Sequence, residues 1–222
     1  MKTKSKTPIP QIVYRVSEMV ARMVKGVGVG TNLAIWHVLM TLMSGRLLAS
    51  RGAIIPALSA SGLNQQASVR AWRGAAVGAW QANELLKGLH EQVIAEQQWE
   101  ALQIGGRSVK AYDTVGFFRP RLQCGAGKHY DSQAGKALPA LTFGILGAVG
   151  TVKEQPVTLP LSIVRGQGRA AKSDDALMQQ LIKAAVTQIT PDDVITADRK
   201  FPPVRLLESG CKAIVIRRPP KT

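Results

Sequence analysis

The sequence predicts a mixed α and β protein, with a helical region over residues 1–104 and a mixed β-sheet over residues 105–222. Apolar residues recur at helical spacing through the first region. Short β-branched runs separated by polar breaks follow Gly105 and Gly106. The later elements come in the order three strands, helix, strand, helix, strand. With 45% hydrophobic residues in 222, the chain can bury a sizeable core.

The helical region begins with an amphipathic helix over Pro10–Lys25, which carries Arg15, Glu18 and Arg22 on its polar face. The GVGVG stretch at 26–30 ends this helix. It lacks both the GxGxxG spacing and a preceding strand, so we interpret it as a linker and not a phosphate loop. A second helix, capped by Thr31 or Asn32, follows to residue 43.

Residues 52–74 predict two short helices around a Gly62-Leu63-Asn64 turn, which is typical of a helix-turn-helix. We expect Trp72 to be buried. Side chains of types that reach base edges and phosphates would be exposed on the second helix: Gln65, Gln66, Ser68, Arg70 and Arg73. Pro56 interrupts the first helix, and a plain helical bundle explains the pattern equally well. A long helix from Ala75 to about Leu102 closes the region.

The sheet region alternates strands and helices. Strands are predicted at Ser108–Phe118, Ala140–Val152, Val157–Arg165, Val194–Ala197 and Ala213–Arg217, and helices at Asp174–Thr187, capped by Ser173, and Pro202–Glu208. Three consecutive strands suit an antiparallel meander. The last two strands, each reached through a helix, suit parallel additions to the same sheet.

The charge balance indicates a polyanionic partner. The chain has 29 Lys and Arg against 14 Asp and Glu, a net charge of +15. This excess favours a nucleic acid as partner, although a merely basic surface is the alternative. Cys124 and Cys211 lack metal or disulfide spacing, which favours a reducing, cytoplasmic location. The apolar runs are too short for a membrane span.

Two carboxylates are the candidate catalytic residues. Asp113 interrupts the otherwise half-buried strand SVKAYDTVGFFRP, where an isolated carboxylate needs a partner. Asp198 ends a later strand, 198 − 113 = 85 positions on. If these strands are neighbours, the acids can share a hard cation such as Mg²⁺. The alternative is two surface acids paired with Arg119 and Arg199.

Four segments occur in an order that resembles the catalytic half of DDE insertion-sequence transposases: AYDTVGFFRPR, GAGKHYDSQAGKALPALTFGILGAV, QPVTLPLSIVRGQ and ITADRKFPPVRLLESG. The resemblance covers about residues 105–218 and implies an RNase H-like fold. It implies that Asp113 and Asp198 are the first two catalytic, metal-binding acids, with Mg²⁺ or Mn²⁺ as cofactor. It also implies DNA partners, namely element ends and a target, with a homo-oligomer on DNA in the nucleoid.

The resemblance further implies a third acid, usually Glu, on a helix beyond the last strand. The chain holds no Asp or Glu after Glu208. We therefore expect an incomplete RNase H-like sheet, a truncated and inactive transposase, and exposure of Ile214 and Ile216 where the missing helix would pack.

Further basic and aromatic residues are candidate DNA contacts. The predicted loop Gly125–Asp131 carries Lys128, His129 and Tyr130, which suit phosphate contact or base stacking but also the shaping of a turn. The arginines that flank the acids could neutralise the DNA backbone: Arg119, Arg121, Arg165 and Arg169.

The sequence thus favours DNA transposition by metal-assisted phosphoryl transfer. Two alternatives stay open. One is a non-catalytic, basic nucleic-acid-binding protein, and the other is a component of a ribonucleoprotein, in which Asp113 and Asp198 would share no role.

Overall fold

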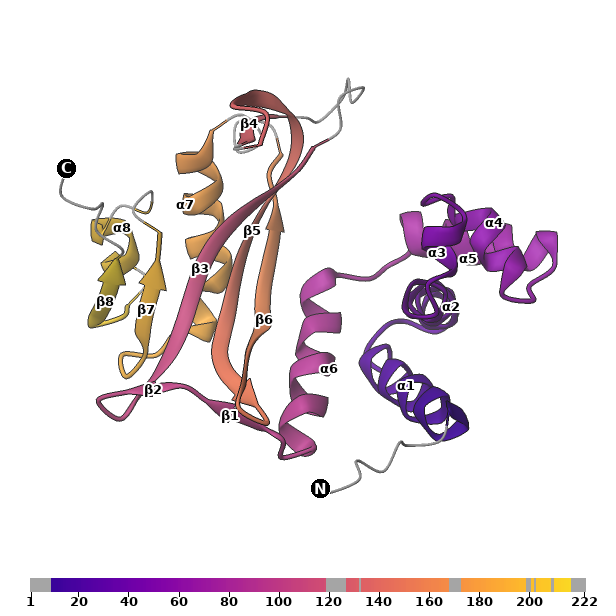
Figure 1. Cartoon of the computed structure of the whole chain (residues 1–222), viewed down its shortest axis with the longest axis horizontal. Helices are drawn as coiled ribbons and strands as arrows, with labels where there is room; N and C mark the ends of the chain where they lie inside the picture. The colour runs from indigo at the N-terminus through magenta and orange to yellow at the C-terminus, as the bar shows by residue number, and fades with distance from the viewer. Residues whose placement is uncertain are drawn as a thin grey trace, which may run out of the picture. The chain divides into compact units, whose positions relative to one another are not determined.

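The computed structural model describes residues 9–118, 127–131, 133–167, 173–198, 201, 203–208 and 210–216. The fold is mixed α and β with an open mixed sheet (Figure 1). The chain divides into two compact units, residues 1–95 and 96–222. The division lies before the boundary predicted near residue 105, because residues 99–101 already form a strand of the second unit.

The first unit is helical in its described part. Its helices are α1 (Ile9–Met23), α2 (Thr31–Met43), α3 (Arg46–Ala49), α4 (Ile54–Ala60), α5 (Gln65–Val77) and α6 (Ala82–Ala95). Helix α1 packs on α6, and α2 packs on α5. Val24, Val27, Ile35 and Leu85 form the buried cluster of this unit. Gly88 permits the close approach of α6 to α1, because a Cβ there would lie 3.0 Å from the Cα of Met23.

The prediction of one helix over residues 75–102 was wrong. Helix α5 ends at Val77, α6 ends at Ala95, and the chain then becomes extended. Gly78 adopts an extended conformation, with ψ 162°. A Cβ at this position would lie 2.2 Å from the Gly74 carbonyl oxygen, so the break depends on glycine. Apolar spacing alone did not reveal the break, because the periodicity resumes after it.

The second unit contains the sheet. Its strands are β1 (Trp99–Ala101), β2 (Gln103–Ile104), β3 (Arg107–Phe118), β4 (Gly127–Asp131), β5 (Lys136–Val152), β6 (Gln155–Arg165), β7 (Val194–Ala197) and β8 (Ala213–Ile216). Its helices are α7 (Asp174–Ala185), the 3₁₀ turn η2 (Val186–Gln188) and α8 (Pro203–Glu208). Ser173 caps α7 as predicted, since its Oγ accepts a hydrogen bond from the Ala176 N–H at 3.3 Å.

Strands β6, β5, β3, β7 and β8 are neighbours in the sheet in that order (Figure 1). Strand β5 is antiparallel to both β6 and β3. Strand β7 is parallel to β3, and β8 is parallel to β7. This pairing agrees with the predicted meander followed by two parallel additions.

The hairpin formed by β4 and β5 was not predicted. Residues 127–131 were expected to be part of a loop, but they pair with residues 136–140 of β5. The Asp131 carboxylate closes the turn by accepting hydrogen bonds from the Gln133 N–H at 2.9 Å and the Ala134 N–H at 3.4 Å. The glycines of this segment suggested a loop, whereas β4 is a strand that pairs with β5, the next strand along the chain.

The main core lies between the sheet and its helices. Leu177 and Leu181 of α7 are fully buried and pack with Tyr112, Ile195 and other apolar residues of this cluster. Phe201, which precedes α8, and Leu206, which lies within α8, join the same cluster. We call this side of the sheet the covered face.

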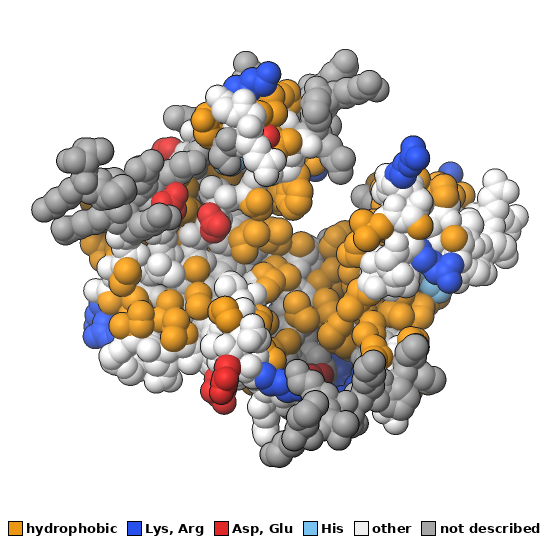
Figure 2. Space-filling view, in the orientation of Figure 1, with side chains coloured by type: hydrophobic (Ala, Val, Ile, Leu, Met, Phe, Trp, Pro, Cys, Tyr) orange, Lys and Arg blue, Asp and Glu red, His pale blue; other side chains and the backbone are white. Residues whose placement is uncertain are grey.

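The other side of the sheet carries Asp113, Phe117 and Val215, and we call it the open face. Phe117 and Val215 are 55% and 50% exposed. Figure 1 draws α7 behind the strands, and Figure 2 shows hydrophobic side chains over the strands on the face turned to the viewer. The expectation that Ile214 and Ile216 are exposed was wrong, because both alternate onto the covered face and pack against the core.

Candidate functional site

The parallel pairing of β3 with β7 brings the two candidate acids together. Its register runs from Val109 opposite Val194 to Tyr112 opposite Ala197. Asp113 is the next residue of β3, and Asp198 is the residue that directly follows β7. Neighbouring strands lie about 4.8 Å apart, and laterally paired residues share a face. Continuing this register by one residue would place Asp113 and Asp198, 85 positions apart in sequence, side by side at the carboxyl end of β7.

Both acids are exposed, which corrects the expectation that Asp113 is a half-buried carboxylate in need of a partner. Strand alternation explains the difference, because the adjacent Tyr112 takes the covered face and is 2% exposed. The Asp113 Oδ1 accepts a hydrogen bond from the Thr114 N–H at 2.7 Å. Desolvation therefore does not require a partner for Asp113.

The backbone at Asp198 is held by the start of the turn into α8. The Asp198 carbonyl accepts a hydrogen bond from the Phe201 N–H at 3.0 Å. The Phe201 ring stacks on Tyr112, with ring centroids 5.9 Å apart and planes 29° apart. Phe201 therefore connects the segment that bears Asp198 to the residue that precedes Asp113.

A largely buried ion pair, which the sequence analysis missed, lies on the covered face at the start of β7. The Lys110 Nζ donates to the Asp193 Oδ2 at 2.6 Å and to the Gln188 carbonyl oxygen at 2.5 Å. The same Asp193 oxygen accepts from the Thr190 N–H at 2.6 Å and the Thr190 hydroxyl at 3.0 Å. The Lys110 and Asp193 side chains are 14% and 6% exposed. The pair joins β3 directly to the turn that begins β7.

Burial raises the pKa of the Asp193 carboxyl, but the hydrogen bonds from Lys110 and Thr190 and the charge of Lys110 outweigh this effect. The pKa of Asp193 therefore lies below its ordinary value. The carboxylate remains ionised at neutral pH, as an ion pair requires.

The donor set of Asp113 and Asp198 suits a hard divalent cation, because carboxylate oxygens are the ligands that Mg²⁺ and Mn²⁺ prefer. Within the described part of the chain, no three His, Cys, Asp or Glu residues come together as a metal-binding group. Two carboxylates alone would be a partial ligand set for such a cation, which water or a bound substrate would complete.

Helices α4 and α5 form the predicted helix-turn-helix arrangement. Gly62 makes the turn with φ +96°, and the Asn64 side chain caps α5 by accepting from the Ala67 N–H at 2.9 Å. Pro56 does not interrupt α4, because it lies in the first turn, where its missing N–H has no helical partner to lose. The turn therefore orders both helices as the sequence suggested.

The exposed residues of α5 largely match the prediction. Gln65, Gln66, Arg70 and Arg73 are exposed, and Gln66, Arg70 and Arg73 share one face by helical spacing. Ser68 does not join them, because it is fully buried and its hydroxyl lies 3.1 Å from that of Ser59. Trp72 is 38% exposed and not buried, since Ser68 and Ala71 form the inner face of α5.

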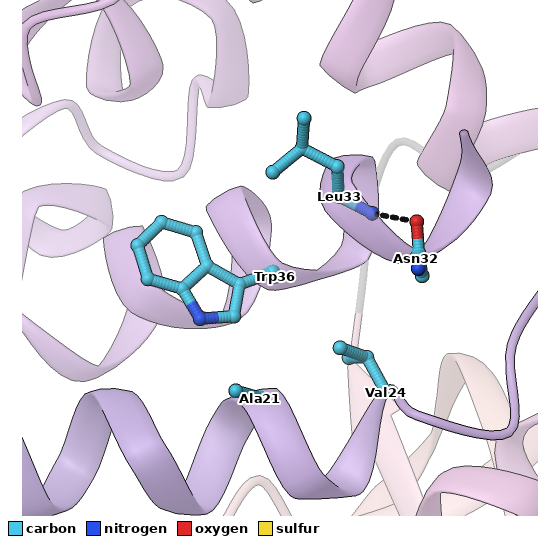
Figure 3. A pocket seen from close by; sticks show the side chains of 5 residues that line it. All are labelled: Ala21, Val24, Asn32, Leu33 and Trp36. Atoms are coloured by element: carbon cyan, nitrogen blue, oxygen red, sulfur yellow. Dashed lines mark hydrogen bonds between the residues drawn. The ribbon is translucent and has the colours of Figure 1, made fainter. Parts of the chain in front are cut away.

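Two cavities of the helical unit lie beside α2. One of about 320 Å³ is lined by Ala21, Val24, Asn32, Leu33 and Trp36 (Figure 3). The Asn32 Oδ1 accepts from the Leu33 N–H at 2.7 Å, so its polar group serves the start of α2. The other, of about 310 Å³, adjoins His37 and Arg70. Burial lowers the pKa of His37, which favours its neutral form.

The candidate DNA contacts around the β4–β5 hairpin differ in how far their side chains are exposed to solvent. Tyr130 is 61% exposed, and Arg165 is exposed at the end of β6. His129 is half-buried and packs beside Phe118, with ring centroids 6.2 Å apart. It also fills the space above Gly116, where a Cβ would lie 2.6 Å from its ring. Lys128 belongs to β4, and Arg119, Arg121, Cys124 and Arg169 lie outside the described residues.

Comparison with known proteins adds no relative, because no family model, curated protein or solved structure matches the chain. Among the helices that the structure describes, none is long and apolar enough to cross a membrane.

We predict that Asp193 contributes to stability in a pH-dependent way. Because its folded pKa is depressed, its contribution is present above the unfolded value of about 3.9 and is lost as pH falls through the folded value. Asp193→Asn should lower the free energy of unfolding at pH 7 by about 3 kcal/mol. It should also flatten the pH dependence below about pH 4. Urea unfolding between pH 2 and pH 7 measures both effects.

The matched control is Asp192→Asn, which alters the adjacent but exposed acid. It should leave the curve nearly parallel to that of the parent. An Asp193→Asn curve that coincides with the control curve would show that the buried pair is not the source of the acid sensitivity.

Proposed function

We propose that the second unit is a metal-dependent phosphoryl-transfer unit that acts on DNA and is of the DDE transposase type. Asp113 and Asp198 are its two metal-binding acids. The observation that carries the proposal is the β3–β7 register, which continues directly into these residues. A chance pair of surface acids would have no reason to meet at the carboxyl end of two parallel strands.

The topology supports the same proposal. An RNase H-like domain, as the resemblance implies it, has a three-stranded meander, a helix, a parallel strand, a second helix and a further parallel strand. The order β6-β5-β3-β7-β8 and its strand directions fit this arrangement. The first acid lies on the opening strand of the meander and the second directly after the first parallel strand.

A bound divalent cation would stabilise charge on a phosphoryl group and lower the pKa of a bound water. The protein's part is to present oxygen ligands in a fixed position. The Thr114 N–H orients Asp113, and the turn to Phe201 fixes the backbone at Asp198. Because the described residues add no third acid, we expect weak metal binding and little or no strand cleavage from this ligand set alone.

DNA would be held mainly by charge. The net charge of +15 favours counterion release from a phosphate backbone. The α5 face that carries Gln66, Arg70 and Arg73 has the side-chain types that contact base edges and phosphates. Tyr130 and Arg165 are exposed in the second unit and suit stacking and phosphate contact.

A second candidate function is DNA binding without catalysis. The observation that favours it is the partial ligand set, since two carboxylates without a third hold a cation loosely. Both candidates predict DNA binding, whereas the first alone predicts that Asp113 and Asp198 act together on a metal.

The metal test of the proposal measures Mn²⁺ affinity by calorimetry or by the EPR signal of free Mn²⁺. Asp113→Asn and Asp198→Asn should each weaken binding by about tenfold or more, because each removes one of two charged ligands. Asp192→Asn, an exposed acid away from the pair, is the control and should bind like the parent. Equal affinities in all four proteins would refute the shared site.

The DNA test measures duplex affinity between about 50 and 200 mM salt, where backbone-dominated binding weakens steeply. Arg70→Gln and Arg73→Gln should each reduce the slope of log K against log salt by about 1. Lys87→Gln, which removes an exposed charge from α6, is the matched control. Slopes that change equally in all three variants would show that α5 has no special part in DNA contact.

A further inference from the structure

The register of β7 against β3 is weakly specified by hydrophobic patterning. Strand β7 has only four residues, and three of them, Val194, Ile195 and Ala197, are buried. Since these residues are apolar on both faces, a shift by one position would still bury apolar side chains. Such a shift would move every side chain of β7 to the opposite face. Asp198 would then lose its place beside Asp113.

The candidate acids themselves oppose the observed register. Like charges on laterally paired residues destabilise strand pairing. Asp113 and Asp198 follow the last register pair directly and both are exposed on the open face. An interaction elsewhere that a shifted strand would lose would favour the observed alignment over the shifted one.

The Lys110–Asp193 pair has the geometry for this task. Lys110 lies on β3 opposite Ile195, and Asp193 immediately precedes β7. The ammonium group is held by the Asp193 carboxylate and by the Gln188 carbonyl oxygen, which belongs to the turn before β7. Thr190 fixes the same carboxylate from within that turn. A one-residue shift would break these contacts and leave a charge buried.

We infer that Lys110 and Asp193 are positioning residues, which fix the β3–β7 register and thereby hold Asp113 beside Asp198. This inference rests on the proposed function for its significance, but the register role is physically separate from metal binding. A buried ion pair is weak evidence for stability, whereas its best-attested use is to select one alignment of packed elements.

The experiment needs a register readout that leaves both acids intact. Ala111 and Thr196 are paired in the observed register and are half-buried on the open face. Introducing Ala111→Cys and Thr196→Cys, with Cys124→Ser, adds two thiols that lie within disulfide reach only when the register is native; the remaining thiol, Cys211, is buried. Disulfide formation under a mild oxidant measures alignment, Mn²⁺ affinity measures the metal site, and circular dichroism reports folding.

The test variant is Lys110→Met/Asp193→Asn, which removes both buried charges together and so leaves neither unpaired. The matched control is Lys212→Met/Asp192→Asn, the same chemical change at two exposed positions. We expect the test variant to fold, to form the disulfide much more slowly than the control, and to bind Mn²⁺ about tenfold or more weakly.

A folded test variant that forms the disulfide and binds Mn²⁺ like the control would overturn the inference. Slow disulfide formation combined with a parent protein that does not bind Mn²⁺ would support the register role and refute the proposed metal site. If the double variant does not fold, Asp193→Asn decides by the same two readouts, because its amide oxygen can still accept from Thr190.

Discussion

The parallel ladder between β3 and β7 is the constraint on which the second unit depends. It joins parts of the chain that are far apart in sequence, and it attaches the two parallel strands to the antiparallel meander. On the covered face, Tyr112 and Ile195 of the ladder belong to the same buried cluster as Leu177 and Leu181 of α7. At the carboxyl end of the β3–β7 ladder lie Asp113 and Asp198, the two acids on which the proposed chemistry depends.

The two faces of this ladder differ in their charged residues: one has two acids, and the other has an acid paired with a lysine. On the open face, Asp113 and Asp198 are like charges in a row, exposed to water and suited to a cation. On the covered face, Lys110 and Asp193 are opposite charges, buried and fully engaged with the turn before β7. The attraction between Lys110 and Asp193 on the covered face thus favours a strand alignment that the like charges of Asp113 and Asp198 disfavour.

Strong local signals allowed much of this fold to be predicted. The run VITA between turn residues marked β7, and the Ser173 cap marked the start of α7. Interactions between distant residues were not visible in the same way. Lys110 and Asp193 are 193 − 110 = 83 positions apart, and only the strand pairing shows that they meet. The sequence signal for this pair was Lys110 within a predicted strand that is otherwise mostly uncharged. No sequence motif marked Asp193 as its partner.

The errors have related causes. The break at Gly78 and the β4 strand were missed because local composition does not show what a segment packs against. The exposure of Asp113 and the burial of Ile214 both follow from strand alternation. That rule becomes predictive only when the covered face is known, and the position of α7 determined it here.

A crystal structure of the protein soaked in Mn²⁺ would show whether Asp113 and Asp198 share a metal ion. We expect an anomalous density peak between their two carboxylates, with Tyr112 of β3 opposite Ala197 of β7. Ordered carboxylates on opposite faces of the sheet, or ordered side by side without a peak, would contradict it.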